Sequence, residues 1–469
     1  MTTTNKSLTQ CILEGKEKST SLQKELLITY SEQIKSINPI SAFEVAKMQS
    51  NGRRFFWSNA SRDLILVGFD KCFELENQFS HHFEIHEKKW DSLLDDSMTF
   101  PKNRDDLVGP MLLGGFCFDP LKPNTNLWRE FPSSRLTLPK FMVIKRKDTT
   151  WFTFNMLVSK DTDEEVVVDN YMSIKEQILR ESLKTIDDTS FLNVEYEEID
   201  SHKWMETVDH AAHRVRLREI DKVVLARSLK INVKGNKKLS ASSILNNLYI
   251  QQSSTYLFAI EYENDCFIGA SPERLIESRE DVFVSEALAG TTKRSLNKIE
   301  DIRLGNELLK DEKNLYEHKV VVDMIKKVME ETCYKVKMPK EPMLYKNQHI
   351  QHLYTPIKGY KRAGISLLTM IRMLHPTPAM NGYPPQKALR FIREKESLDR
   401  GWYASPIGWI GPYGKGEFVV GIRCGLIKDN EIFLFSGCGV VGDSESELEY
   451  EETKTKFLPM ISAIFNNKL

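Results

Sequence analysis

Single charged residues recur inside segments of this chain that otherwise have the composition of a buried core. Five such segments lie between Lys222 and Lys456: DKVVLARS, ASPERLIE, NLYEHKVVVDMI, EFVVGIRCGLI and YEETKTKFLPMI. An unpaired ion in an apolar interior costs several kcal/mol, so a core keeps one only where it is paired, binds a metal or does chemistry. The pattern therefore predicts an active site that is built into a large folded core.

The composition limits the partners and the location of the protein. The chain has 469 residues, of which 41% are hydrophobic, and its 65 Lys and Arg residues nearly balance its 66 Asp and Glu residues. This balance argues against nucleic acid or an acidic membrane surface as a partner. The scattered cysteines form no C-x-x-C pair, and the first residues lack the apolar stretch of a signal peptide. We expect a cytoplasmic protein that does not enter a membrane.

Residues 1–200 are predicted to form an N-terminal half that contributes to the same sandwich as the rest of the chain. A helix is expected around residues 21–37, SLQKELLITYSEQIKSI. Strands are expected at residues 53–60, 64–70 and 141–158. The polar, acidic stretch at 187–201 is interpreted as the seam with a catalytic region at 201–469.

The catalytic region alternates β-rich runs with helical patterns. The β-rich runs lie at residues 221–233, 255–263, 265–278, 281–291, 417–427 and 431–441. Helices are expected at residues 202–220, at about 299–332 and at the C-terminal end. The long helix is apolar on two sides, so it should be mostly buried, with the carboxylate of Glu317 pointing inward. Alternation along 417–427 would place Arg423 between two glycines on one face of a strand.

Several of these features also have a structural explanation. Ser446 and Glu449 fit an S-x-x-E capping box, and Lys222 could be the solvated end of a strand. His318 and His375 are predicted to be hydrogen-bonded core or rim residues, because neither has the spacing of a metal site. The sequence GCGVVG at 437–442 matches G-x-G-x-x-G, but too little chain follows it for a dinucleotide-binding unit. Its glycines would instead let backbone N–H groups approach a carboxylate.

On these segments the second half resembles the chorismate-binding enzymes, most closely the isochorismate synthases. The resemblance covers about residues 203–466 and rests, in order, on KVVLARS, GASPERLI, ALAGTTKR, NELLKDEKNLYEHKVVVDMI, QHLYTPIKG, LHPTPAMNGYP, RGWYASPIGWIG, FVVGIRCGLI and GCGVVGDSESELEYEETKTK. The first half, with RRFFWS and GGFCFDP, is similar to the longer isochorismate synthases of menaquinone biosynthesis rather than the shorter siderophore type. The resemblance implies an α+β fold of the anthranilate synthase component I type, with two stacked, mainly antiparallel β-sheets and outer helices.

The resemblance also implies a reaction and a set of site residues. Water attacks C2 of chorismate while the C4 hydroxyl leaves, and Mg²⁺ binds the ring carboxylate. Lys222 matches the general base and Glu273 the general acid. Glu317 and Glu452 match the Mg²⁺ ligands, and Glu449 would reach the ion through water. The residues at substrate-binding positions are Gly290, Thr291, Lys293, Ala379, Arg423, Gly437 and Lys456.

Individual positions separate the related activities. Anthranilate synthases usually have glutamine where Lys222 stands, and aminodeoxychorismate synthases often have a nucleophilic lysine where Ala289 stands. Salicylate synthases keep the base lysine and then eliminate pyruvate, so they are the main enzymatic alternative; Ala379 in HPTPA favours an isochorismate synthase. Asn314 replaces an acidic residue that the family often has, which leaves the outer metal shell open.

A different class of function is a non-catalytic chorismate-binding subunit, or one that works only with a glutamine amidotransferase. The presence of both Lys222 and Glu273 argues against a non-catalytic subunit. Water as the nucleophile removes the need for an amidotransferase. We therefore expect a monomeric, Mg²⁺-dependent enzyme that acts on chorismate without an obligatory partner.

Overall fold

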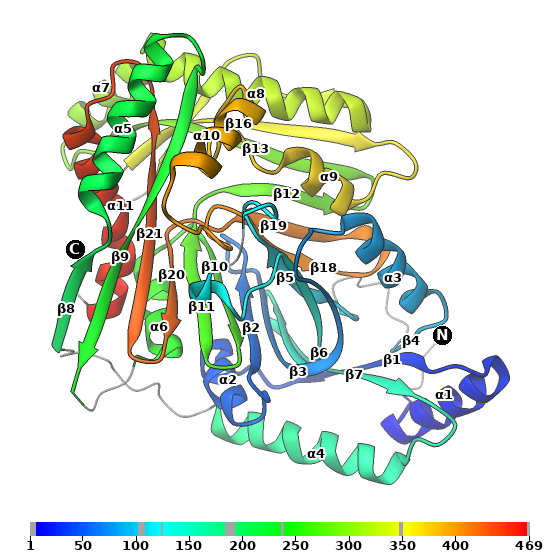
Figure 1. Cartoon of the computed structure of the whole chain (residues 1–469). Coiled ribbons are helices and arrows are strands. Elements are labelled where there is room, and N and C mark those ends of the chain that lie inside the picture. Colours follow the sequence, from blue (N-terminus) through cyan, green and yellow to red (C-terminus); the bar gives the residue numbers. More distant parts are fainter. Residues whose placement is uncertain are drawn as a thin grey trace.

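The computed structural model describes residues 6–101, 108–122, 125–182, 193–235, 239–346 and 350–466 of the chain. Within these ranges 21 strands are joined by hydrogen bonds into two runs that share the long strand β6 (Ser134–Arg146), as Figure 1 shows. The pairing of β1 (Leu26–Ile34) with β4 (Met98–Phe100) is parallel, and the other pairings among the described residues are antiparallel.

The first run is the larger sheet, and its apolar centre is buried on both faces. Its strands are, in order, β8 (Asn193–Glu198), β9 (Lys222–Lys234), β21 (Glu431–Val440), β20 (Cys424–Lys428), β11 (Asp265–Ser271), β10 (Tyr256–Tyr262), β2 (Arg53–Ser58), β3 (Leu64–Asn77), β6, β7 (Thr149–Val158), β1 and β4, and the short β17 (Gly382–Tyr383) also pairs with β9. Both β10 and β11 are buried over their whole length.

The second run starts from the same strand β6 and faces the first across the larger hydrophobic core. Its strands are β6, β5 (Leu112–Phe116), β18 (Pro406–Ile410), β19 (Gly416–Val420), β12 (Arg274–Arg279), β13 (Val282–Lys293) and β16 (Ile350–Lys361), with β14 (Cys333–Lys337) and β15 (Met343–Lys346) both paired to β16. The core between the runs contains Phe258 from the first and Phe418 from the second. The predicted fold of stacked, mainly antiparallel sheets with outer helices is confirmed.

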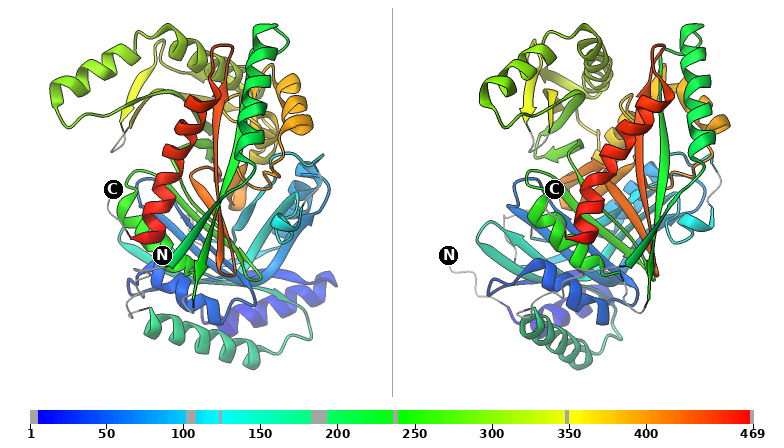
Figure 2. Two further views of the ribbon diagram at one scale, coloured as in Figure 1. Left: turned by 60° about the vertical axis from the view of Figure 1, so that its left-hand side comes forward. Right: turned by 90° about the vertical axis from the view of Figure 1, so that its left-hand side faces the viewer.

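Helices cover the outside of the sheets. A second hydrophobic core lies between the larger sheet and α1 (Leu8–Leu22), α2 (Pro39–Val45), α4 (Glu164–Glu181), α6 (Ala241–Gln251) and α11 (Ser446–Phe465). Figure 2 shows α1 and α4 at the end of the molecule opposite α8 (Glu312–Thr332). The remaining helices are α3 (Phe83–Asp95), α5 (Ser201–Arg216), α7 (Lys298–Leu308), α9 (Leu367–Leu374) and α10 (Pro385–Lys395), with short 3₁₀ turns at Ala46–Met48, Asn126–Trp128 and Pro412–Gly414. No helix of the described residues is long and apolar enough to cross a membrane.

Strands from the first 200 residues lie inside both runs. Strand β2 pairs with β10, where Phe56 is opposite Ala259, and β5 pairs with β18, where Gly115 is opposite Ile407. Part of the predicted seam, residues 187–192, lies outside the described residues, and its continuation forms β8, which pairs with β9. The division of the chain at residues 200 and 201 stays a prediction.

Two helix predictions are wrong. The helix expected at 21–37 is instead the end of α1 followed by β1, which lies between β7 and β4 and is buried along its first half. The single helix expected at 299–332 is two helices, because Asp311 caps the second one: its carboxylate accepts the N–H of Asn314 (2.8 Å).

The predicted strand at 417–427 and the predicted capping box also differ from the structure. Strands β19 and β20 are separate, because Arg423 has a left-handed backbone (φ 52°) that ends the alternation. Helix α11 has Glu445 at its N-cap without a side-chain hydrogen bond, and the Ser446 hydroxyl donates to Glu447 (3.2 Å). The direction of the Arg423 side chain is therefore determined by the turn between β19 and β20, not by the alternation of a continuous strand.

Candidate active site

Lys222 lies at the start of β9, between two neighbouring strands. It pairs with Tyr383 of β17 (Gly382–Tyr383), and the next residue of β9 pairs with β21. Its ammonium group is 3.2 Å from a carboxylate oxygen of Glu317 on α8. The side chain runs alongside Gly439 of β21, where an added Cβ would lie 2.5 Å from the Lys222 Cε. Glycine at position 439 therefore provides the space through which the lysine reaches the site.

Glu273 lies in the turn between β11 and β12 and is 6% exposed. Its backbone is fixed from two sides: its N–H donates to the Ser271 hydroxyl (3.2 Å), and its carbonyl accepts the N–H of Val420 (3.0 Å). Burial and, to a smaller extent, the charge of Glu286 raise the pKa of Glu273 to about 8, although the charge of Arg423 opposes this rise. The carboxyl is therefore protonated at neutral pH and can donate its proton.

Arg423 places a half-buried cation beside this carboxyl. Burial lowers the pKa of the guanidinium, while the neighbouring Tyr403, Glu452 and Glu273 raise it. The residue has a left-handed backbone, which costs a non-glycine residue free energy and is often found at functional sites. A guanidinium in this position can bind a carboxylate of a ligand through two parallel hydrogen bonds.

Helix α11 brings a second lysine and two carboxylates to β21. The Lys456 ammonium group is 2.6 Å from a Glu452 carboxylate oxygen and donates to the carbonyl of Gly437 (2.7 Å). Glu449, one turn earlier, accepts a hydrogen bond from the Ser444 hydroxyl (2.7 Å). The predicted common face of Glu449, Glu452 and Lys456 therefore lies towards the end of β21.

Gly290 forms a bulge in β13 next to α8. Its φ of 77° favours glycine, and an added Cβ would lie 3.1 Å from the Asn314 side-chain oxygen. The Asn314 amide also donates to the Asp311 carboxylate (2.8 Å). Asn314, which replaces an acidic residue of the family, thus lies between this bulge and the helix cap, one turn before Glu317.

His352 on β16 is a functional candidate that the sequence interpretation missed. Its Nδ1 is 2.8 Å from the hydroxyl of Thr291, and its Nε2 is buried without a hydrogen-bond partner among the described residues. Burial, together with the charges of Arg423 and Lys456, lowers its pKa to about 4. The neutral imidazole can therefore donate to an anionic ligand. In the sequence, His352 lies within QHLYTP, a segment without the spacing of a metal site.

The remaining predicted residues lie at the edge of this group. Lys293 is exposed where β13 ends. Ala379 lies in the turn that leads into β17, the strand that pairs with Lys222. The interpretation of His318 and His375 as hydrogen-bonded core residues is confirmed. A ring nitrogen of His318 is 2.8 Å from the Thr355 hydroxyl, and one of His375 is 3.0 Å from the Phe118 carbonyl oxygen.

The carboxylates of α8 and α11 fit a magnesium ion only together with a ligand. Among the described residues, no three His, Cys, Asp or Glu side chains are close enough to form a metal site by themselves. Mg²⁺, however, is usually bound by one or two carboxylates together with waters and substrate oxygens. The carboxylates of Glu317 and Glu452 carry hard oxygens, and each pairs with a lysine. The donor set is therefore suitable for Mg²⁺ rather than for a metal that needs nitrogen or sulfur.

The comparisons with known proteins place the chain in a family. A family model described as chorismate binding enzyme matches residues 7–465. The chain is 38% identical to the isochorismate synthase MenF of Bacillus subtilis over 99% of each chain, and 31% identical to the salicylate biosynthesis isochorismate synthase of Pseudomonas aeruginosa over 94% of this chain and 91% of that protein. Its fold is similar to that of the menaquinone-specific isochorismate synthase MenF from Escherichia coli, with a TM-score of 0.77 at 21% identity over 98% and 100% of the two chains. The chain belongs to the chorismate-binding enzymes.

Proposed function

We propose that the chain is an isochorismate synthase that converts chorismate to isochorismate with Mg²⁺, for menaquinone biosynthesis. The observations that support this most are the lysine at the start of β9, whose ammonium group meets Glu317, and the buried Glu273 beside Arg423, whose pKa is raised to about 8. A full-length relative at 38% identity is named an isochorismate synthase MenF. Because water is the nucleophile, the enzyme works without an amidotransferase. It acts in the cytoplasm and as a monomer.

Lys222 and Glu273 divide the proton transfers of the reaction between them. Lys222 in its neutral form accepts a proton from the attacking water, whose oxygen bonds to C2 of chorismate. The ring double bonds shift and the bond from C4 to its hydroxyl breaks. Glu273 gives its proton to this hydroxyl, which leaves as water. One water enters and one leaves, so the product is an isomer of the substrate.

The remaining residues bind and orient the two carboxylates of chorismate. Arg423, Lys456 and the neutral His352 supply donors from three different elements. The bulge at Gly290 lets backbone N–H groups approach the ligand. Glu317 and Glu452, with Glu449 through water, would hold a Mg²⁺ ion, which when bound neutralises a carboxylate and stabilises negative charge on the ring.

The product of purified enzyme distinguishes the proposed function from its alternatives. With chorismate and Mg²⁺ we expect a product that has the mass of chorismate and a different retention time, and we expect chelation of the metal to stop its formation. Chromatography coupled to mass spectrometry identifies it. Formation of salicylate and pyruvate, with isochorismate only as an intermediate, would support a salicylate synthase. An unchanged substrate would support a non-catalytic subunit.

The reaction is expected to slow at alkaline pH. Burial raises the pKa of Glu273 to about 8, so its carboxyl carries the proton below this pH and loses it above. Only the protonated form is a general acid, so once Lys222 is neutral kcat/KM should fall about tenfold for each pH unit above about 8. Initial rates across neutral and alkaline buffers test this. A rate that keeps rising through the alkaline range would contradict the assignment of Glu273.

A further inference from the structure

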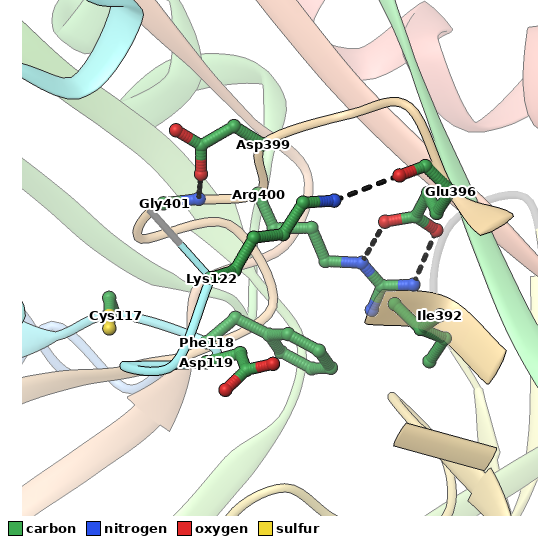
Figure 3. Close-up of a pocket in the computed structure, with 9 residues that line it drawn as sticks. All are labelled: Cys117, Phe118, Asp119, Lys122, Ile392, Glu396, Asp399, Arg400 and Gly401. Atoms are coloured by element: carbon green, nitrogen blue, oxygen red, sulfur yellow. Dashed lines mark hydrogen bonds and ion pairs between the residues drawn. The ribbon is translucent and has the colours of Figure 1, made fainter. Parts of the chain in front are cut away.

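A buried ion pair, Glu396 and Arg400, lies outside the active site and joins the chain segments that carry the active-site residues. Arg400 and Glu396 are 3% and 2% exposed, and two nitrogens of the guanidinium donate to the two carboxylate oxygens, each at 2.7 Å. Figure 3 shows this pair together with Lys122, Asp399 and Phe118, which line the same small cavity of about 10 Å³. The cavity has room for about one water molecule, so it is not itself a ligand site.

The ion pair is bonded to the backbone of β9 just after Lys222 and to the backbone of the turn that leads into β17. Arg400 donates to the carbonyl of Val224 on β9 (2.7 Å) and to the carbonyl of Met380 (2.9 Å), the residue after Ala379. Glu396 accepts the N–H of Ala226 on β9 (2.7 Å). Strand β9 begins at Lys222, so the pair fixes this strand against the turn that leads into β17, next to the lysine.

The first half of the chain supports the pair from the other side. The guanidinium of Arg400 lies over the ring of Phe118, 4.2 Å from its centroid. Lys122 donates to the carbonyls of Glu396 (2.9 Å) and Leu398 (2.6 Å), and the bond to Glu396 is drawn in Figure 3. Both members of the pair are therefore held by several groups at once, which leaves β9 little freedom to shift.

We propose that Glu396 and Arg400 are positioning residues for Lys222: they fix β9 so that the lysine meets the attacking water. This inference rests on the proposed isochorismate synthase function. A buried ion pair generally adds little stability compared with apolar residues of the same size, so stability alone does not account for it. Its hydrogen bonds to Val224, Ala226 and Met380 give it a geometric role instead.

Glu396→Gln tests the inference because ammonia reacts without a general base. Ammonia can attack C2 in place of water, while Glu273 still protonates the leaving hydroxyl. Displacement of a catalytic group by about 1 Å can cost ~100-fold, so isochorismate formation should fall ~10- to 100-fold. The aminated product formed at high ammonium concentration should fall much less, so its ratio to isochorismate should rise at least ~10-fold over wild type. Lys222→Ala should change this ratio in the same direction.

A matched control separates positioning from general stability. Arg54 and Glu261 form another buried pair with two hydrogen bonds of 2.8 Å, far along the sheet between β2 and β10. Glu261→Gln should lower both products by one common factor, whatever it does to the melting temperature. If Glu396→Gln does not fold, Arg400→Lys, which keeps the charge with fewer donors, takes its place. An unchanged product ratio in the folded variant would overturn the inference, whereas a wild type that makes no isochorismate would overturn the proposed function itself.

Discussion

Glu273→Gln is expected to lower isochorismate formation by ~10²- to 10⁴-fold, the range typical of a lost general acid. Glutamine has nearly the same volume as the protonated carboxyl and no proton to give to the leaving hydroxyl. The side chain is buried and its backbone is bonded to Ser271 and Val420, so the fold should persist. Chorismate should still bind, because Arg423 remains. Product analysis gives the rate, and titration calorimetry with chorismate gives the affinity.

The general base is distinguished from the general acid by a second nucleophile. Lys222→Ala should lose isochorismate formation to a similar extent, but at high ammonium concentration and a pH of about 8, where Glu273 still carries its proton in part, it should form an aminated product. Glu273→Gln should form neither product, because departure of the hydroxyl still needs an acid. Equal isochorismate formation by wild type and either variant would refute the role assigned to that residue.

Several strands of the catalytic half could be predicted from the sequence because their segments are rich in β-branched and aromatic residues and are bounded by turn residues. The segments at 221–233 and 431–441, for example, correspond to β9 and β21. The failure at residues 26–34 has a physical reason. A short apolar run fits either period, and its pairing with β4 and β7, which lie far along the chain, makes it a strand.

Breaks inside elements were harder to predict than the elements themselves. Asp311 ends one helix and starts the next by capping, although the apolar stripe continues on both sides. The turn at Arg423 separates β19 from β20 because they pair with different strands, β12 and β11. A left-handed arginine is disfavoured locally, so only the surrounding structure can impose it.

The chemistry of the site could be predicted from isolated charges in apolar runs, but the pairing of those charges could not. Lys222 and Glu317 are far apart in sequence and meet only because α8 packs near the start of β9. The pair of Glu396 and Arg400 has the spacing of an exposed helical ion pair, yet α10 ends at Lys395 and the pair is buried. Spacing alone cannot distinguish these two cases.

Loss of a proposed magnesium ligand is the second change that we expect to have a large effect on activity. Glu317→Gln or Glu452→Gln should lower Mg²⁺-dependent turnover by at least ~100-fold, the scale of a lost electrostatic contribution to the transition state. Each change removes one negative charge at nearly constant volume. Both carboxylates are at least partly exposed, Glu452 to 51%, so the fold should be retained and the melting temperature should change little.

The ligand assignment needs a measurement of metal binding beside activity, because each substitution also breaks an ion pair with a lysine. Titration of the chorismate complex with Mg²⁺ should show a weaker affinity in both variants. Glu451→Gln is the matched control: it lies on the same helix, is 65% exposed and pairs only with Lys454 among the described residues, so it should bind Mg²⁺ as wild type does. Normal turnover by Glu317→Gln or Glu452→Gln at low Mg²⁺ would show that the ion is held by other groups, since a direct ligand cannot lose its charge without weakening the site.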